Sequence, residues 1–425
     1  MIDLNKVREN VVAYKEICKN KNKNVDVDKV LELDDKRKEL QQKIDSLKYQ
    51  QKEFAAKKDY DSAKNLKLKI QEIESEYSSV YGEYMELLKT LPNFIHEDTP
   101  IWNSEEENVV IKTVWDITKF DFEPKDHEEI GKIHDIIDKE TASKVSGARF
   151  TYLKGELVLM QMAIIQYVFA TLWDKKIIQK IIKEKWLNIS DLPFRPILPP
   201  AILSMEVMDR MWRLHPMDDR YCLHEDKQVF NGSAEHTMWP MFMDHMFEEK
   251  DLPVRYIGYS PSFRREAGTY WKDTKWILRM HQFDKLEMEV FSTSDTSMDE
   301  QELIVWLQEY MMQELKLPYQ LVLKCTADMG SIDYRAIDVE TWMPWQWKYR
   351  ETHTSDNMTD YQARRLNTKV KRENWAKEFV HMNDATAFAL GRVMIAIIEN
   401  YQTEDWRIKI PEVLRKYMGD REYIG

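Results

Sequence analysis

Two runs of residues with heptad spacing constrain this chain more than any other feature. Each run alternates intervals of three and four residues, and a polar stretch over 55–65 separates the two. The first run comprises Val30, Leu33, Arg37, Leu40, Ile44, Leu47, Gln51 and Phe54, and the second comprises Leu66, Ile70, Ile73, Tyr77, Val80, Tyr84 and Leu87. Two complementary seams with a short connection predict an antiparallel coiled-coil hairpin. At 1.5 Å per residue, each helix would be roughly 35–40 Å long.

Lysines gather near the tip of this predicted hairpin. Their positions are Lys48, Lys52, Lys57, Lys58, Lys64, Lys67 and Lys69. The whole chain has a formal net charge of −12, but a local basic surface can still contact phosphates. A coiled coil is more often a dimerisation device, so this pattern leaves two alternatives open: a dimer contact and an RNA-binding arm.

The length allows two or three domains, and the composition favours a protein that stays in the cytoplasm. The chain has 425 residues, and proline boundaries at Pro92 and Pro100 divide it into a domain over 1–100 and a mixed α/β domain over 101–425. No run of 18 apolar residues occurs, so we expect no membrane span. The first residues carry no apolar signal region, and the three cysteines are far apart, which favours a reducing compartment.

Beyond residue 100 the periodicity predicts an α+β fold, with an antiparallel sheet flanked by helices. Strand patterns occur at 254–264, 277–291, 319–325, 335–343 and 378–382. Helical patterns occur at 155–173, 299–315 and 387–401. The proline-bounded segment over 194–200 suits a sheet edge or a subunit interface. Strands that follow one another without regular intervening helices favour antiparallel pairing.

A basic hairpin over 260–289 is the strongest candidate for a binding site. It carries five cations, at Arg264, Arg265, Lys272, Lys275 and Arg279, around Glu266 and Phe283. Arginines can hold phosphate oxygens and a ring can stack on a base, so the hairpin suits a nucleoside triphosphate. No glycine-rich phosphate loop is present. A solvated surface hairpin remains the alternative on charge alone.

Six segments, taken together in order, resemble the class II aminoacyl-tRNA synthetases in the form found in seryl-tRNA synthetases. The hairpin FRREAG…RMHQFDKLEME resembles motif 2, and ATAFALGRVMIAIIENYQ over 385–402 resembles motif 3. LPFRPILPP over 192–200 lies where motif 1 is found. GSAEHT over 232–237, YRETHTSDN over 349–357 and IPEVLRKYMG over 410–419 are also similar.

The resemblance implies a homodimer without membrane attachment that binds ATP, Mg²⁺, L-serine and tRNA(Ser), and raises charging of tRNA(Sec) as a further possibility. The activity would be ATP-dependent formation of seryl-adenylate, followed by transfer to tRNA. The coiled-coil arm would hold the tRNA through Lys48, Lys52, Lys57, Lys58 and Lys64. Two alternatives are a non-catalytic binding module on the same fold and a ligase that loads a carrier protein.

The resemblance also implies roles for individual residues. Arg264 would hold the α-phosphate and Arg392 the γ-phosphate, and these are the candidate catalytic residues. The expected ATP site comprises Arg264, Arg265, Glu266, Met280, Phe283, Glu351, Thr352, His353, Thr354 and Arg392, with Glu351 and Thr354 on Mg²⁺. The expected serine site comprises Ser233, Ala234, Glu235, Arg264, Glu287 and Thr386. Glu266 would contact the adenine amino group, Phe283 would stack on the ring, and Glu287 would bind the serine ammonium.

Tryptophan departs from the family pattern. Ten tryptophans lie where the family has glycine: Trp102, Trp115, Trp212, Trp239, Trp271, Trp276, Trp345, Trp347, Trp375 and Trp406. The chain has only 11 glycines, where average usage of roughly 7% predicts about 30. One hypothesis is that the gene uses UGA codons that its host reads as glycine. If the chain carries these indoles, we expect impaired ATP binding, because glycine is used where a backbone must approach a ligand.

Overall fold

The structure is a computed structural model of the chain that describes residues 1–266 and 278–425. Trp271, Trp276, Lys272 and Lys275 of the predicted hairpin therefore lie outside the described residues. The chain divides into two compact units, Met1–Phe94 and Ile95–Gly425, which are described separately.

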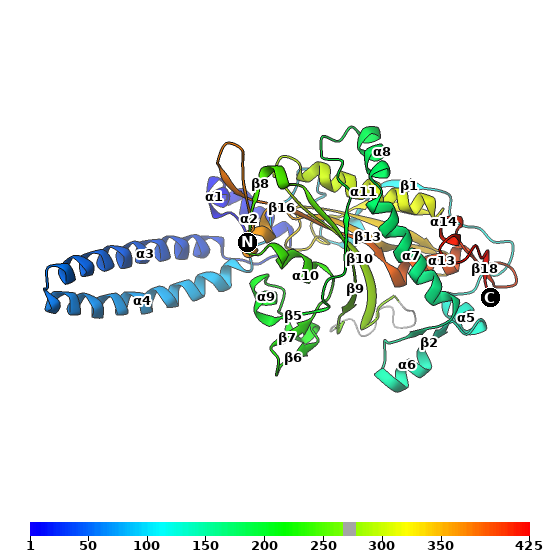
Figure 1. Cartoon of the computed structure of the whole chain (residues 1–425), viewed down its shortest axis with the longest axis horizontal. Coiled ribbons are helices and arrows are strands. Elements are labelled where there is room, and N and C mark those ends of the chain that lie inside the picture. The colour runs from blue at the N-terminus through cyan, green and yellow to red at the C-terminus, as the bar shows by residue number, and fades with distance from the viewer. Residues whose placement is uncertain (267–277) are drawn as a thin grey trace. The chain divides into compact units, whose positions relative to one another are not determined.

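The first unit is helical and is dominated by a long helical hairpin (Figure 1). Helices α1 (Leu4–Glu9) and α2 (Val11–Asn20) precede α3 (Val27–Ala56) and α4 (Tyr60–Leu88). Leu40 and Ile44 of the first predicted seam and Ile70 and Val80 of the second are buried. The two helical faces that the heptads predicted therefore pack on each other.

Side-chain caps set the boundaries of these helices. Asp26 accepts a hydrogen bond from the Lys29 amide at the start of α3, and Asp59 accepts one from the Ser62 amide at the start of α4. Asn10 caps α2 in the same way. An N-cap residue has non-helical backbone angles, so Asn10 separates α2 from α1.

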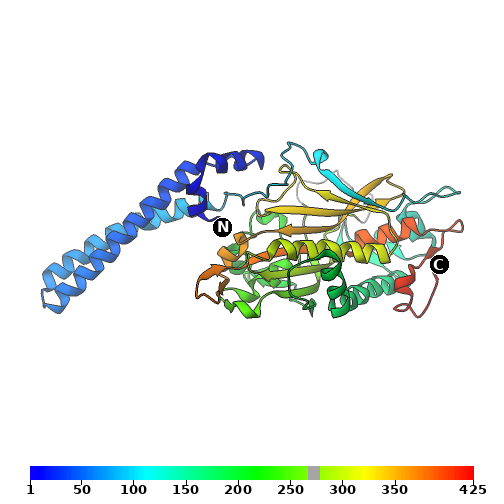
Figure 2. The same ribbon diagram turned by 90° about the horizontal axis from the view of Figure 1, so that it is seen from above.

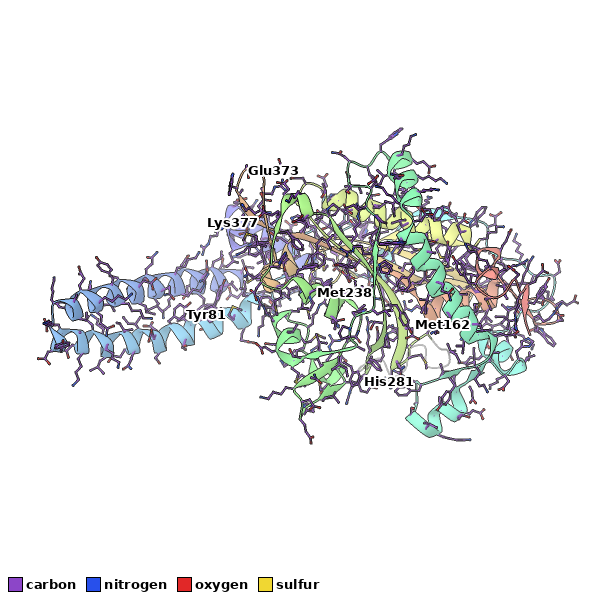
Figure 3. The ribbon with its side chains drawn as sticks, in the orientation of Figure 1. Tyr81, Met162, Met238, His281, Glu373 and Lys377 are labelled. Atoms are coloured by element: carbon purple, nitrogen blue, oxygen red, sulfur yellow. The ribbon has the colours of Figure 1, made fainter. Side chains whose placement is uncertain are left out.

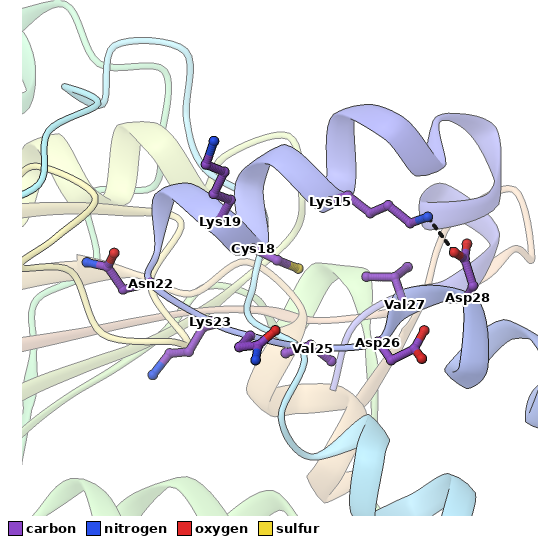
Figure 4. A pocket seen from close by; sticks show the side chains of 10 residues that line it. Lys15, Cys18, Lys19, Asn22, Lys23, Val25, Asp26, Val27 and Asp28 are labelled. Atoms are coloured by element: carbon purple, nitrogen blue, oxygen red, sulfur yellow. Dashed lines mark hydrogen bonds and ion pairs between the residues drawn. The ribbon is translucent and has the colours of Figure 1, made fainter.

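A hollow of about 550 Å³ lies where α2 ends and α3 begins (Figure 4). Lys15 and Asp28 form an ion pair at 2.5 Å beside it, and the buried thiol of Cys18 lines it. Burial raises the pKa of the Cys18 thiol to about 11, so the thiol stays protonated and poorly nucleophilic at neutral pH.

The second unit is built on a large, mainly antiparallel sheet. The described residues contribute eight strands to it, in the order β1-β11-β12-β13-β16-β10-β9-β4. Among the described strands of this sheet, only β4 pairs in parallel, with β9. The strands are β1 (Val109–Val114), β4 (Arg195–Ile197), β9 (Val254–Phe263), β10 (Gln282–Ser292), β11 (Tyr319–Leu323), β12 (Arg335–Met343), β13 (Lys348–Asn357) and β16 (His381–Ala389).

The predicted α+β class is confirmed, and most of the expected sheet strands occur close to their expected positions. The edge position predicted for 194–200 is also confirmed, because β4 ends the sheet. The fifth expected strand, over 378–382, instead spans the end of β15 (Lys377–Phe379) and the start of β16. Strand β13 was not expected, because its sequence KYRETHTSDN is polar throughout. It forms a central strand nevertheless, since β12 and β16 pair with it on both sides.

Three helices contribute most of the helical side chains in the largest apolar core, which they share with this sheet. They are α7 (Glu156–Trp173), α11 (Ser297–Glu314) and α13 (Leu390–Asn400), and α11 runs along the strands in Figure 2. Gln308 of α11 donates from Nε2 to the carbonyls of Thr354 and Thr386, at 2.7 and 2.8 Å. This helix therefore fixes the positions of β13 and β16, two strands that carry expected site residues.

Helix α7 is the one described helix whose length and hydropathy would suit a membrane span. It matches the helical pattern over 155–173, and Leu157, Ala163, Ile164 and Val168 are fully buried in the core. Its apolar sequence is therefore explained by packing inside the second unit.

Shorter elements complete the second unit. The helices are α5 (His127–Ile133), α6 (Lys139–Ser146), α8 (Lys175–Lys185), α9 (Met205–Arg210), α10 (Glu235–Met238), α12 (Tyr361–Leu366) and α14 (Glu412–Arg415), with 3-10 turns at Glu105–Glu107, Met217–Asp219, Trp239–Phe242 and Glu249–Asp251. The small sheets comprise β2 (Ile137–Asp138), β3 (Tyr152–Leu153), β5 (Ile202–Ser204), β6 (Cys222–Leu223), β7 (Gln228–Phe230), β8 (Met246–Glu248), β14 (Lys369–Lys371), β15 (Lys377–Phe379), β17 (Ile408–Lys409) and β18 (Tyr423–Ile424). Tyr81 of the first unit and several residues of the second are marked in Figure 3.

Candidate active site

The alternation of side chains along β10 creates the polar face of the site. Leu286 and Met288 belong to the core shared with the helices. Because successive side chains of a strand point to opposite faces, Glu287 and Glu289 lie on the other face, where both are buried. The neighbouring strand β16 brings Thr386 opposite Glu287 and Asp384 opposite Glu289. Four polar side chains from two strands therefore share one surface.

Glu287 lies at the centre of the expected serine site. The Ser233 hydroxyl donates to Glu287 Oε1 at 2.6 Å, and the ammonium of Lys285 forms an ion pair with the same carboxylate. Lys285 was not predicted from the sequence. It precedes Glu287 by two residues on the same face of β10, so a cation already occupies the position next to this carboxylate.

The helix α10 supplies the other expected serine-site residues. Ala234 and Glu235 begin this helix and are buried. Met238, labelled in Figure 3, packs against β9 so closely that a Cβ added at Gly258 would lie 2.4 Å from its sulfur. Glycine at 258 therefore allows α10 to approach the sheet and places Glu235 beside the polar face.

His236 orients Glu235. The Gly232 amide donates to Nδ1 of His236 at 3.0 Å, so Nδ1 must be an acceptor and Nε2 carries the proton. Nε2 lies 3.1 Å from Glu235 Oε1 and donates to it. Burial lowers the pKa of His236 to about 4, which keeps this ring neutral at pH 7.

The four carboxyl groups of this surface differ in charge. Burial opposes ionisation of Glu235, but Arg213 and His236 outweigh it and hold its pKa well below the usual value. Burial raises the pKa of Glu287 despite the nearby Lys285. Burial and neighbouring carboxylates raise the pKa of Glu289 and Asp384 well above the usual range. The surroundings therefore favour the ionised form of Glu235 and the protonated forms of Glu289 and Asp384.

Arginines form the expected phosphate-binding side. Arg264 donates from Nε to the Gly232 carbonyl at 2.9 Å, and its guanidinium lies 5.3 Å from the centre of the Phe283 ring. The expected phosphate ligand and the expected adenine-stacking ring are thus neighbours. Glu266 accepts a hydrogen bond from Arg279 at 3.1 Å, and Arg265 lies 5.1 Å from the Tyr221 ring.

Two hollows adjoin these residues. One, of about 340 Å³, is lined by Arg213, Asp219, Arg220, Glu235, His236, Arg264 and Glu266. Burial, followed by repulsion from Arg213 and Arg264, lowers the pKa of Arg220. An anion bound among these three guanidiniums would relieve that repulsion. The other hollow, of about 390 Å³, is lined in part by Met280, Phe283 and Gly391 and offers a less polar space.

Arg392 and Glu351 come together although 41 residues separate them. Arg392, in the first turn of α13, donates to the Glu351 carbonyl at 2.8 Å and to its Oε1 at 2.9 Å. The Glu351 side chain is 43% exposed. Partial desolvation opposes its ionisation, but Arg392 and Lys324, and to a lesser extent Lys285 and Arg264, lower its pKa. Charged residues of the expected ATP site and of the expected serine site are therefore close enough to influence each other's pKa values.

Three further expected residues have different surroundings. Thr354 shares a hydrogen bond with Thr386, 3.1 Å between hydroxyl oxygens, and so links β13 to the serine side. Thr352 is buried and bonds to Thr341 at 2.7 Å, and His353 packs its buried ring against Phe388. Thr352 and His353 are enclosed by protein as whole residues, at 1% and 0% exposure, so neither presents an exposed group to a ligand in this structure.

Comparison with known proteins identifies the family. The model of the seryl-tRNA synthetase N-terminal domain matches residues 1–95, and the model of the class II tRNA synthetase core domain (G, H, P, S and T) matches residues 221–401. A serine–tRNA ligase of Dictyoglomus turgidum is 36% identical over 99% of both chains. The chain belongs to the seryl-tRNA synthetase family. The predicted family resemblance is therefore confirmed over the full length.

Other family members agree in sequence and in fold. A serine–tRNA ligase of Nitrosopumilus maritimus is 33% identical over 100% of both chains. The crystal structure of the Pyrococcus horikoshii seryl-tRNA synthetase complexed with ATP superposes with a TM-score of 0.86, at 30% identity, over 100% of this chain and 99% of that one. The class II fold and the long helical hairpin are thus family features.

Four residues of the site were missed by sequence analysis: Arg213, Arg220, His236 and Lys285. Arg213 and Arg220 lie in a stretch without a distinctive spacing, and only the fold brings them to Arg264. His236 lies within the GSAEHT segment, and Lys285 lies within the motif 2 segment. The family segments that contain His236 and Lys285 were the one signal in the sequence that could have indicated these two residues as part of the site.

Proposed function

We propose that this chain is a serine–tRNA ligase, which couples L-serine to tRNA(Ser) through a seryl-adenylate at the expense of ATP. The observation that carries the proposal is the pairing of a buried carboxylate pocket at Ser233, Glu235 and Glu287 with a guanidinium cluster around Arg264. A small substrate with an ammonium group fits the first, and a polyphosphate fits the second. Family membership supports both assignments.

The proposed first step is in-line attack of the serine carboxylate on the α-phosphorus of ATP, with pyrophosphate as the leaving group. Glu287 and Glu235 bind the ammonium, and Thr386 bonds to the serine hydroxyl. Arg264 stabilises charge on the α-phosphate, and Arg392 binds the γ-phosphate. No protein nucleophile is required, because the site acts through positioning and electrostatics.

The residues present suit Mg²⁺ as the cofactor. Glu351 offers a partly exposed carboxylate with a lowered pKa, and Thr354 offers a hydroxyl on the same strand. These are hard oxygen ligands, and Mg²⁺ is commonly held by one or two carboxylates together with substrate phosphates. Bound there, the ion would neutralise charge on the phosphates. Glu266 and Phe283 would bind adenine, with Arg265, Met280, Thr352 and His353 around the nucleotide.

The proposed tRNA site is the tip of the helical hairpin. Lys52, Lys57, Lys58 and Lys64 are exposed there, whereas Lys48 forms an ion pair with Glu74 at 2.7 Å. Exposed lysines can neutralise phosphates of a long RNA arm. Charging of tRNA(Sec) by the same contacts is a further part of this proposal.

We also infer a cytoplasmic homodimer. The open edge of the sheet at β4 and the 73% exposed Leu198 beside it suit a contact with a second copy. The cysteines Cys18, Cys222 and Cys325 are all free, which suits a reducing compartment.

Serine-dependent exchange between ATP and pyrophosphate, measured across the amino acids, tests the proposal. We expect exchange with serine and little with alanine, because loss of the hydroxyl leaves buried polar groups unpaired. Binding of tRNA without exchange would favour the non-catalytic alternative. Exchange followed by loading of a carrier protein, with no charging of tRNA(Ser), would favour the carrier-protein ligase.

A further inference from the structure

Among the described residues, six tryptophans have backbone angles that bulky residues rarely adopt. Their φ values are 66° at Trp115, 54° at Trp186, 57° at Trp212, 51° at Trp347, 70° at Trp375 and 61° at Trp406. Positive φ brings Cβ too close to the backbone of an L-residue, whereas glycine has no such penalty. No other non-glycine type supplies more than three of the described positions with positive φ, although tryptophan accounts for only 14 of the 425 residues.

Two of the six lie in three-residue hairpin loops. The Trp375 amide donates to the Arg372 carbonyl at 2.9 Å, and the Arg372 amide donates to the Ala376 carbonyl at 2.8 Å. Glu373 and Lys377 mark this hairpin in Figure 3. Trp406 makes the equivalent bond to the Thr403 carbonyl at 2.8 Å. In such loops a type I turn is followed by one left-handed residue, which is usually glycine.

Two others end helices. Trp186 follows α8 with left-handed angles, and the next amide, of Leu187, donates to the Ile182 carbonyl at 3.1 Å. Trp212 follows α9, and the Arg213 amide donates to the Met208 carbonyl at 3.0 Å. A left-handed residue at this point closes the last turn of many helices, and it is most often glycine.

The last two end or join sheet strands. Trp347 lies in the turn between β12 and β13, where its amide donates to the Pro344 carbonyl at 3.2 Å. Trp115 directly follows β1. Both indoles are exposed, at 71% and 56%, so they contribute little to the core. Trp306 in α11 and Trp342 in β12 differ, because they lie within regular elements and have no positive φ.

We propose that glycine occupies these six positions in the protein that its own host makes, and that the six codons are UGA read by a glycine tRNA. The inference goes beyond the proposed function and rests on backbone conformation rather than on family pattern. It adds Trp186, which the family comparison did not indicate. Trp102, Trp239 and Trp345 of the earlier hypothesis have no positive φ, and Trp271 and Trp276 lie outside the described residues, so this proposal does not depend on them.

Mass spectrometry of peptides from the protein isolated from its native host, together with the gene's codons, tests the proposal. We expect glycine and UGA at all six positions, and tryptophan with UGG at the control positions 306 and 342. Tryptophan detected at any of the six, or a UGG codon there, would overturn the proposal for the set.

A second measurement uses the chain as written and does not need the host. A variant with glycine at all six positions should unfold at a higher urea concentration than the parent chain. The matched control is Trp173→Gly, because Trp173 is also exposed, at 55%, but ends α7 with ordinary helical angles. The control should unfold at a lower concentration. A six-glycine variant no more stable than the parent would contradict the conformational argument.

Discussion

Replacement of Glu287 by glutamine tests the centre of the proposed serine site. Glu287 is fully buried and contacts Ser233 and Lys285. The change keeps the shape of the side chain but removes its charge, so the serine ammonium loses a charge-assisted hydrogen bond. Such a bond contributes about 1.5–3 kcal/mol, which corresponds to a loss of about 10- to 150-fold in kcat/KM for serine. Exchange between ATP and pyrophosphate at varied serine concentration measures this loss.

The same substitution also leaves the buried Lys285 without its counter-charge. Breaking one side of a buried ion pair costs about 3–5 kcal/mol of folding free energy, which urea unfolding would detect. The matched control is the double variant Glu287→Gln with Lys285→Met, which removes both charges. We expect it to recover most of the stability but not the activity with serine.

This design separates recognition from folding. If the double variant regained the parental kcat/KM for serine, the loss in the single variant would come from the unpaired Lys285, and the assigned role of Glu287 would be wrong. An unchanged kcat/KM for serine in the single variant would refute the role directly.

Three further predictions concern other parts of the molecule. The pKa of His236 is about 4 in the folded protein and about 6.5 in the unfolded chain. Between these pH values the unfolded state binds more protons than the folded state. The free energy of unfolding should therefore fall as pH drops from about 6.5 to 4. His236→Asn should flatten that slope in urea unfolding, and an unchanged slope would show that other groups cause it. Arg392→Ala should lower kcat/KM for ATP by about 10- to 100-fold, since it removes charge-assisted contacts. Arg392→Lys should recover part of that loss. An alanine variant as active as the parent chain in the exchange assay would exclude a γ-phosphate role for Arg392. Neutralising the exposed tip lysines Lys52, Lys57 and Lys58 should reduce the slope of log affinity for tRNA(Ser) against log salt concentration by about 2–3, while ATP–pyrophosphate exchange stays unchanged. The control variant neutralises three ion-paired lysines of the same hairpin, Lys36, Lys38 and Lys43. An equal change of slope in the control variant would argue against a tRNA contact at the tip.

Residue patterns with a strong period predicted their elements well. The heptad runs gave both long helices, and the alternation of Leu286, Met288 and Val290 gave a strand with one apolar face. Those patterns work because a helix or a strand must bury one side of a regular surface. Strand β13 shows where this logic ends: its polar sequence carries no such signal, and its place in the sheet comes from its two neighbours.

The sequence by itself determined the elements with a strong period, the order of the family segments and the identity of the residues that carry charge. Only the tertiary structure decided which charges meet. Arg392 reaches Glu351 across 41 residues, and Lys285 neutralises Glu287 within a buried face. The fold also sets which carboxyl groups ionise readily. Burial and neighbouring charges, not residue type, lower the pKa of Glu235 and raise the pKa values of Glu289 and Asp384. The tryptophans with left-handed backbone angles are a similar case. The family pattern indicated glycine at most of these positions, and the positive φ gives the physical reason why glycine is favoured there.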